Sequence, residues 1–335
     1  MGIYKTFNKI GVCTSLFIYQ YIDEGNLNLI NLLFIIADTQ NTLDKNFYFL
    51  ELELYKITNL TTWRESNNIH NILKQIPELP DFILVANDLQ NQMYPIISGL
   101  SSINIPTGLI VSDVHRFTEL RRQYIKKNNI SCIFSITHDK FNSVYPEYKN
   151  KMIHFPHFIN PDLYRDYGFK KEIELLMMGA TSNTYPLREK ILEFYKTDPN
   201  FVYHEHPGYK NAKKDREALF YTDKKYAREI NRAKIFFTCP SVFNYPVMKY
   251  YEALACKSLL LAPTFKELEN LGFIPNTHFI PINEYNFKEK ADYFLKNKQE
   301  REKITKAGYQ FIHQNHTLQI RAHQLIKEIS EKISL

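Results

Sequence analysis

The sequence predicts an α/β protein with two doubly wound, Rossmann-like domains that face a central cleft. Short apolar runs alternate with amphipathic helical stretches, and this alternation restarts after Asn160–Pro161. The chain has 335 residues, which suits two domains at about 150 residues each. Strands that alternate with helices are typical of a parallel sheet covered on both faces, and such sheets bind ligands at their carboxyl ends. We expect domains at 1–160 and 161–317, followed by a final helix over 318–335.

Six apolar or β-favouring runs in the first half are expected to form strands, with a polar helix over 116–127. Residues of this kind suit buried strands of a parallel sheet. The expected strands are 31–38 (NLLFIIAD), 48–56 (YFLELELYK), 81–88, 107–113, 132–137 and 152–158.

The second half repeats the pattern and ends in an amphipathic helix. Strands are expected at 174–180, 200–204, 233–239, 258–263 and 278–282, and helices at 186–194, 223–232, 246–256, 287–296 and 301–314. From Leu318 onward, apolar residues recur at helical spacing on one face. We expect this last helix to close the structure and to pack back on the first domain.

Composition excludes several classes of protein. Charged residues make up 23% and hydrophobic residues 44%, which is typical of a globular chain and not of a disordered one. Only 10 glycines occur in 335 residues, so no glycine-rich phosphate loop of the dinucleotide or Walker type is expected. No apolar run reaches the roughly 18 residues that a membrane-spanning helix needs. Cys13, Cys132, Cys239 and Cys256 lack metal or redox spacing, which favours reduced thiols in a cytoplasmic protein.

The net charge is +6, but the basic runs carry no nucleic-acid motif. The runs at 121–127, 213–216 and 224–225 are interpreted as solvated helix faces. A positive cleft would nevertheless attract an anionic ligand.

The most informative stretch is 238–263, TCPSVFNYPVMKYYEALACKSLLLAP, which predicts a strand, a loop, a helix and a strand. Pro246 suits the first turn of that helix, whose free amides can hold an anion. Lys249 and Glu252 are three residues apart and therefore share one helix face. This pair suits a nucleoside diphosphate, with Lys249 at the phosphates and Glu252 at the ribose hydroxyls. The same spacing also fits an ordinary solvated ion pair.

The run VMKYYEALACKSLLLAP resembles the nucleotide-sugar site of GT-B fold glycosyltransferases. It is most similar to the CgeB-like (spore maturation protein-like) branch of the group 1 glycosyl transferases. Three further stretches, at 177–191, 227–239 and 306–326, resemble segments of the same family in the same order. The first half fits more loosely, through IPTGLIVSDVHR and CIFSITHDKF.

The resemblance implies roles for particular residues. Glu252 matches the second glutamate of the family's Glu-x7-Glu signature, which contacts ribose, whereas the first glutamate falls on Asn244. An amide there can still bond sugar hydroxyls. Lys257 stands where the family usually has glycine, which changes either the turn or the local charge. The residues expected at the donor site are Gly179, Ala180, Thr181, Ser182, Tyr185, Arg188, His206, Ser241, Asn244, Tyr245, Pro246, Val247, Met248, Lys249 and Glu252.

Asp113 and His115 are the candidate catalytic residues. They follow the expected strand 107–113, whose end would face the cleft, and either could deprotonate an acceptor hydroxyl. Asp113 could instead cap the helix that follows. The histidines of 204–208 (HEHPG) lack an evident third ligand, so we expect this loop to contact the base or sugar and to bind no metal.

These observations together predict a cytoplasmic glycosyltransferase. The second domain would bind a nucleoside-diphosphate sugar, with a UDP-sugar favoured, and the first would bind a glycan, protein or small-molecule acceptor. The resemblance implies transfer without a metal or other cofactor, and no nucleic-acid partner or transmembrane segment is expected. Two alternatives remain open: a non-catalytic nucleotide- or glycan-binding module, and a glycosyltransferase that acts on modified DNA bases.

Overall fold

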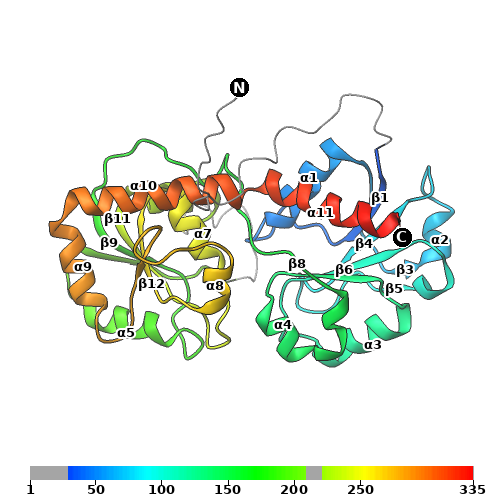
Figure 1. Cartoon of the computed structure of the whole chain (residues 1–335), viewed down its shortest axis with the longest axis horizontal. Coiled ribbons are helices and arrows are strands. Elements are labelled where there is room, and N and C mark those ends of the chain that lie inside the picture. The colour runs from blue at the N-terminus through cyan, green and yellow to red at the C-terminus, as the bar shows by residue number, and fades with distance from the viewer. Residues whose placement is uncertain (1–28, 209–220, 335) are drawn as a thin grey trace, which may run out of the picture.

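The computed structural model describes residues 29–208 and 221–334. The expectations about Cys13 and the basic run 213–216 therefore lie outside the described residues. Two parallel sheets, each covered by helices, lie at the two ends of an elongated molecule (Figure 1). The predicted α/β fold class is confirmed.

The first sheet has six strands in the order β2-β1-β4-β6-β7-β8, and every neighbouring pair is parallel. Because parallel neighbours need crossover connections, helices and loops run between them. The strands are β1 (Asn31–Ile36), β2 (Asn59–Trp63), β4 (Phe82–Ala86), β6 (Thr107–Val111), β7 (Cys132–Ser135) and β8 (Met152–His154), with a separate pair β3 (Asn67–Asn68) and β5 (Ile97–Ser98). The helices are α1 (Asn46–Ile57), α2 (Ile69–Leu73), α3 (Thr118–Asn128) and α4 (Asp139–Val144), with 3₁₀ turns η1 (Leu100–Ser102) and η2 (Pro146–Lys151).

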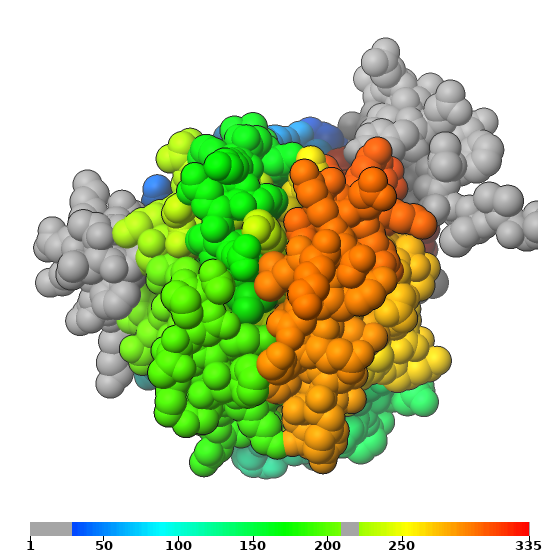
Figure 2. All heavy atoms as spheres, turned by 90° about the vertical axis from the view of Figure 1, so that its left-hand side faces the viewer, coloured from blue at the N-terminus to red at the C-terminus, as the bar shows by residue number. Residues whose placement is uncertain are grey.

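The second sheet has five parallel strands in the order β10-β9-β11-β12-β13. They are β9 (Ile173–Met178), β10 (Phe201–His204), β11 (Ala233–Phe237), β12 (Leu259–Ala262) and β13 (Ile280–Pro281). The helices are α5 (Pro186–Tyr195), α6 (Asp223–Arg232), α7 (Met248–Ala255), α8 (Lys266–Asn270), α9 (Phe287–Lys296), α10 (Lys298–Asn315) and α11 (Leu318–Ile333). Figure 2 shows this end of the molecule, with α9 and α10 in orange beside the green segment that includes α5.

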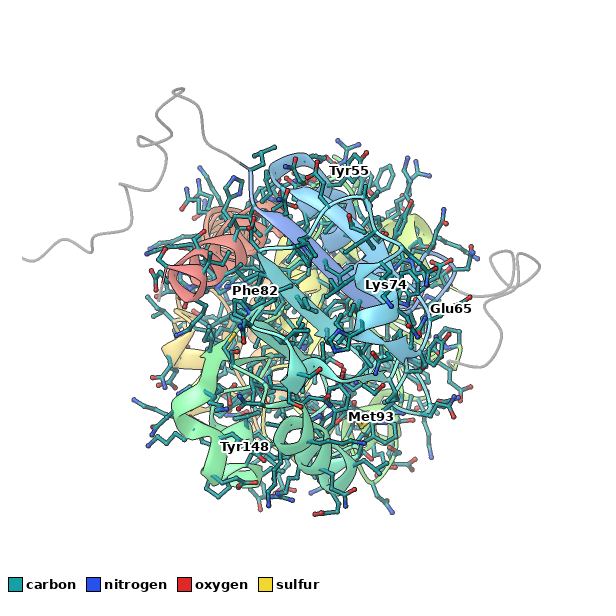
Figure 3. All side chains as sticks on the ribbon, turned by 90° about the vertical axis from the view of Figure 1, so that its right-hand side faces the viewer. Tyr55, Glu65, Lys74, Phe82, Met93 and Tyr148 are labelled. Carbon is teal, nitrogen blue, oxygen red and sulfur yellow. The ribbon has the colours of Figure 1, made fainter. Side chains whose placement is uncertain are left out.

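Each sheet is buried on both faces, which explains why its strands read as continuous apolar runs. In β1, Leu32, Phe34 and Ile36 pack in one core cluster while Leu33 and Ile35 pack in the cluster on the other face. Figure 3 shows the first domain from its own end, with Phe82 of β4 in its middle and Tyr55 and Tyr148 at opposite edges.

Helix α11 belongs to the core of the first domain although it follows the second in sequence. Leu318, Ala322, Leu325 and Ile329 pack in the same cluster as α1 (Figure 1). The chain therefore crosses between the domains twice, and the two crossings meet where Ile159 and Thr317 form a parallel bridge.

A buried carboxylate also joins the two domains. Glu267 of α8 accepts hydrogen bonds from the backbone N–H groups of His138 (2.7 Å) and Asp139 (3.2 Å) at the start of α4. These N–H groups have no partner within their own helix, so the carboxylate of the other domain satisfies them. Residues 138 and 139, which follow the expected strand 132–137, thus contribute to the domain junction.

One predicted strand and the predicted start of one helix were wrong. Residues 48–56 form most of α1 rather than a strand, because Phe47, Leu50 and Leu54 are buried at helical spacing despite many β-favouring side chains. Helix α7 begins at Met248, with Val247 as its N-cap residue, so Pro246 lies in the loop before the helix and not in its first turn.

Lys257 makes the turn for which the resemblance leads us to expect glycine. Its φ is +56°, and the N–H groups of Lys257 and Ser258 bond the carbonyls of Leu254 (3.0 Å) and Ala253 (3.1 Å). This is the Schellman arrangement that ends helices, in which glycine is preferred. The ammonium of Lys257 also pairs with Asp166 at 2.6 Å, so lysine at this position adds a charge and retains the turn.

We expect Lys257→Gly to raise the free energy of unfolding by about 0.5–1 kcal/mol. Replacing a lysine in a left-handed conformation with glycine removes about 1 kcal/mol of backbone strain. The partly exposed ion pair that is lost stabilises the fold by less than that. Lys257→Ala is the matched control, since it loses the ion pair without relieving the backbone and should destabilise. Urea denaturation measures both, and greater destabilisation by glycine than by alanine would contradict the interpretation.

Candidate active site

A cleft with about 840 Å³ of empty space, part of it open to solvent, lies at the carboxyl ends of β9 and β10. The second domain contributes most of its walls. These are formed by Leu163, Tyr164, Met178, Gly179, residues 204–207, residues 221–223, Tyr226, Met248, Lys249 and Glu252. The first domain supplies residues 43–46 and Phe49, from the start of α1. The cleft thus lies where ligands bind in doubly wound sheets.

Gly179 lets a lysine cross the end of the central strand. Its φ is +121°, and a Cβ atom at this position would lie 2.5 Å from Cε of Lys249. Only glycine adopts such a backbone readily. The carbonyl of Gly179 accepts a hydrogen bond from the hydroxyl of Tyr203 (2.9 Å). The loop after β9 is therefore fixed with the lysine packed directly on it.

Arg188 holds this loop from inside the protein. Its guanidinium donates to the carbonyl of Ala180 (3.2 Å), the hydroxyl of Thr238 (2.9 Å) and the carbonyl of Cys239 (3.1 Å). The side chain is buried, and the ring of Tyr185 lies 4.0 Å from it. Arg188 does not line the cleft, and its side chain instead fixes the loop after β9.

Lys249 and Glu252 both face the cleft, and Tyr226 lies between them. The hydroxyl of Tyr226 donates to Oε2 of Glu252 at 2.7 Å, and Nζ of Lys249 lies 5.5 Å from the centre of the same ring. Among the described residues, no carboxylate oxygen lies within 4.0 Å of Lys249 Nζ, so the solvated ion pair that the spacing also allowed is absent there. Burial lowers the pKa of Lys249, while the charge of Glu252 opposes that shift.

His206 adds a third basic group to this part of the cleft. Burial and the positive charges of Lys249 and Arg188 lower the pKa of His206 to about 4. The imidazole is therefore neutral at pH 7. Its neighbour His204 contacts Oε1 of Glu229 at 3.0 Å and packs on the ring of Tyr221.

The hydroxyls of the predicted donor loops make local contacts. Ser182 accepts from the N–H of Thr184 and Ser241 from the N–H of Phe243, both at 3.3 Å, and Thr181 lies 3.4 Å from the hydroxyl of Tyr203. Of the predicted donor residues, those that line the cleft are Gly179, His206, Met248, Lys249 and Glu252. Of the others, Arg188 lies in α5, and the surrounding loops hold Ala180, Thr181, Ser182, Tyr185, Ser241, Asn244, Tyr245, Pro246 and Val247.

Asn244 lies outside this cleft. Its side chain is exposed and borders a separate groove with Lys140 and Phe265. Its φ is +58°, a conformation that asparagine tolerates better than most residues. The turn at this position therefore suits asparagine.

His115 connects the first domain to the loop before α7. Its ring stacks on Phe243 with centroids 3.6 Å apart, and its Nε2 lies 3.1 Å from the hydroxyl of Tyr245. Burial lowers the pKa of His115, while Asp113 opposes that shift. Oδ1 of Asp113 accepts the N–H of His115 at 3.2 Å. The alternative that Asp113 caps the next helix was wrong, since α3 begins at Thr118 after Phe117.

A buried ion pair fixes the turn that carries these two residues. Asp88 bonds Arg121 at 2.8 Å and also accepts the N–H groups of Ser112 (2.9 Å) and Asp113 (3.2 Å). Both charged side chains are almost completely buried. The interpretation of Arg121 as part of a solvated helix face was therefore wrong.

The start of α1 closes one side of the cleft across the two domains. Lys45 pairs with Asp223 at 2.6 Å, and Nδ2 of Asn46 lies 3.4 Å from Sδ of Met248. The sequence interpretation missed this wall because it assigned 48–56 to a strand. The helical spacing of Phe47, Leu50 and Leu54 was the signal that could have found it.

Within the described parts of the chain, no cluster of three His, Cys, Asp or Glu side chains is placed to hold a metal ion. The helices of residues 29–208 and 221–334 include none with the length and apolar character that a membrane span requires.

Comparisons with known proteins agree with this architecture. Residues 186–327 match the family model described as glycosyl transferase-like. HepE of Anabaena, solved with UDP-glucose, is similar in structure at 9% identity and a TM-score of 0.62, covering 90% of this chain and 100% of that one. The chain has the GT-B fold. Sucrose-phosphate synthase of Thermosynechococcus elongatus gives a TM-score of 0.63 at 10% identity, covering 91% and 99% of the two chains.

A third GT-B structure, an α-glucosyltransferase in complex with UDP-glucose and DNA containing an abasic site, gives a TM-score of 0.58 at 11% identity over 89% and 98% of the two chains. No curated protein matches the sequence. The predicted GT-B fold is thus confirmed, and residues 186–327 carry a glycosyl transferase-like domain. The narrower resemblance to the CgeB-like branch stays a prediction.

We expect Gly179→Ala to weaken binding of UDP-glucose at least about tenfold, because the added methyl displaces Lys249 and a charge-assisted bond to phosphate is worth roughly 1.5–3 kcal/mol. Isothermal titration calorimetry measures the change. Gly168→Ala is the matched control, since its φ is +71° and a Cβ there meets nothing within 4 Å. An equal loss of affinity for UDP-glucose in both variants would show that backbone strain alone, and not displacement of Lys249, weakens binding.

Proposed function

We propose that this protein is a glycosyltransferase that moves a sugar from a UDP-sugar to a hydroxyl of a glycan, protein or small-molecule acceptor. One observation carries the proposal: Lys249, Gly179 and Glu252 converge at the carboxyl end of β9, in a cleft between two domains of a GT-B fold. The ammonium and the side-chain-free loop suit a diphosphate, and the buried carboxylate suits ribose hydroxyls.

The leaving diphosphate would be stabilised by protein charges. Lys249 reaches over Gly179, and Arg188 lies behind the same loop. Fixed positive groups of this kind lower the barrier to departure of an anionic leaving group by several kcal/mol. We therefore propose transfer that needs no metal ion, so activity should persist in EDTA.

His115 is the candidate general base. Its neutral imidazole can accept a proton from an acceptor hydroxyl, and it lies on the first domain against the loop that precedes α7. To act as the base, Nε2 of His115 must give up its contact with the hydroxyl of Tyr245 and bond the acceptor hydroxyl instead. Asp113 orients the turn that carries the imidazole.

Incubation with UDP-, GDP- and TDP-sugars and mixed acceptors tests the proposal, with released nucleoside diphosphate as the readout. We expect release from a UDP-sugar, and at least roughly tenfold weaker donor binding in Lys249→Ala. Lys303→Ala, an exposed lysine of α10, is the control and should bind as the wild type does. Unchanged affinity in Lys249→Ala for every nucleotide sugar would contradict the assignment.

The same assay separates the alternatives. Nucleotide binding without turnover in any acceptor pool would favour a non-catalytic module. DNA with modified bases belongs among the acceptors, because one protein with the same fold was solved with UDP-glucose and DNA, and transfer to that DNA alone would favour the DNA-modifying alternative.

We expect the affinity for UDP-glucose to rise about three- to fivefold as pH falls from 7 to 5.5. His206 is neutral in the free cleft, and a bound diphosphate beside Lys249 raises its pKa, so binding takes up a proton. UDP-glucose keeps both phosphates ionised over this range. Calorimetry at each pH measures the trend, which should vanish in His206→Asn; a trend that survives in the variant would exclude His206 as its source.

A further inference from the structure

Tyr226 contacts both of the groups assigned to the nucleotide. Its hydroxyl bonds Oε2 of Glu252 at 2.7 Å, and the face of its ring lies 5.5 Å from Nζ of Lys249. The ring of Tyr164 packs edge-on against the ring of Tyr226, with the two ring centroids 6.3 Å apart. Tyr226 itself lines the cleft, so it can influence a ligand through both neighbours.

The hydrogen bond uses only one side of the carboxylate. A carboxylate has two oxygens and about four acceptor positions. Among the described residues, no hydrogen bond ends on Oε1 of Glu252, although the side chain is buried and lines the cleft. A buried carboxylate oxygen that faces a cleft and accepts no hydrogen bond from the described residues is suited to a donor group of the ligand.

The helix that carries Tyr226 is itself held from the other domain. Asp223, the first residue of α6, pairs with Lys45 at 2.6 Å, and Tyr226 follows one turn later. Tyr226 also packs against the core cluster that contains residues of both α6 and α7, so the phenol hydroxyl has a defined position relative to α7.

We propose that Tyr226 is a positioning residue for recognition of the ribose. It fixes Oε2 of Glu252 so that Oε1 accepts hydrogen bonds from the 2′ and 3′ hydroxyls of a nucleoside diphosphate. The inference rests on the proposed function, since it requires a nucleotide in this cleft. A competing explanation is that the phenol only satisfies a buried carboxylate, in which case its loss affects stability and not ribose discrimination.

Calorimetric titration of the full chain with UDP and with 2′,3′-dideoxyuridine diphosphate tests the proposal. The wild type should prefer UDP by roughly tenfold or more, as expected for hydrogen bonds to a charged group. Tyr226→Phe keeps the ring and should lose most of that preference by weakening UDP alone. Tyr195→Phe is the matched control, because Tyr195 is a buried tyrosine of α5 that does not line the cleft, and it should retain the preference.

Glu252→Gln provides a second variant that is independent of the tyrosine. It should also reduce the preference for UDP, and combining it with Tyr226→Phe should cause little further loss, because both act on the same bond. Equal weakening of both nucleotides by Tyr226→Phe, or no change in either, would overturn the positioning role while leaving the donor site intact. Failure of the wild type to bind either nucleotide would instead overturn the proposed function.

Discussion

The cleft depends on the lack of a side chain at position 179. With a φ of +121° at Gly179, the chain turns sharply after β9, and Lys249 passes over that turn where a Cβ atom would stand. Every other feature of the candidate donor site is arranged around this contact. Arg188 fixes the turn from inside, His206 lies near the same charges, and Glu252 projects from the next turn of the helix that carries the lysine.

A site between two domains also needs the two domains to be held in a fixed relative position. Several contacts of different kinds hold them. Apolar residues of α11 extend the core of the first domain, Glu267 satisfies free N–H groups of α4, and Lys45 pairs with Asp223 at the edge of the cleft. The first two are buried, whereas the ion pair is partly exposed and is therefore the contact most readily exchanged.

Much of the fold followed from local pattern, and the exceptions have physical reasons. Helices α6 and α9 have the predicted bounds because helical spacing and first-turn acids lie within each segment. Residues 48–56 were predicted to form a strand because their β-favouring aromatic side chains obscured the helical spacing of the buried residues. The burial of Arg121 depends on Asp88, which is 33 residues away, and the wall formed by Lys45 depends on a partner 178 residues away. Such pairs are set by tertiary packing and leave no mark on local sequence.

A crystal structure with bound UDP-glucose tests the central claim most directly. The account predicts electron density for the diphosphate between the backbone at Gly179 and Nζ of Lys249, with the ribose beside Glu252. Density for the nucleotide elsewhere on the protein, with Lys249 and Glu252 untouched by the ligand, would contradict it.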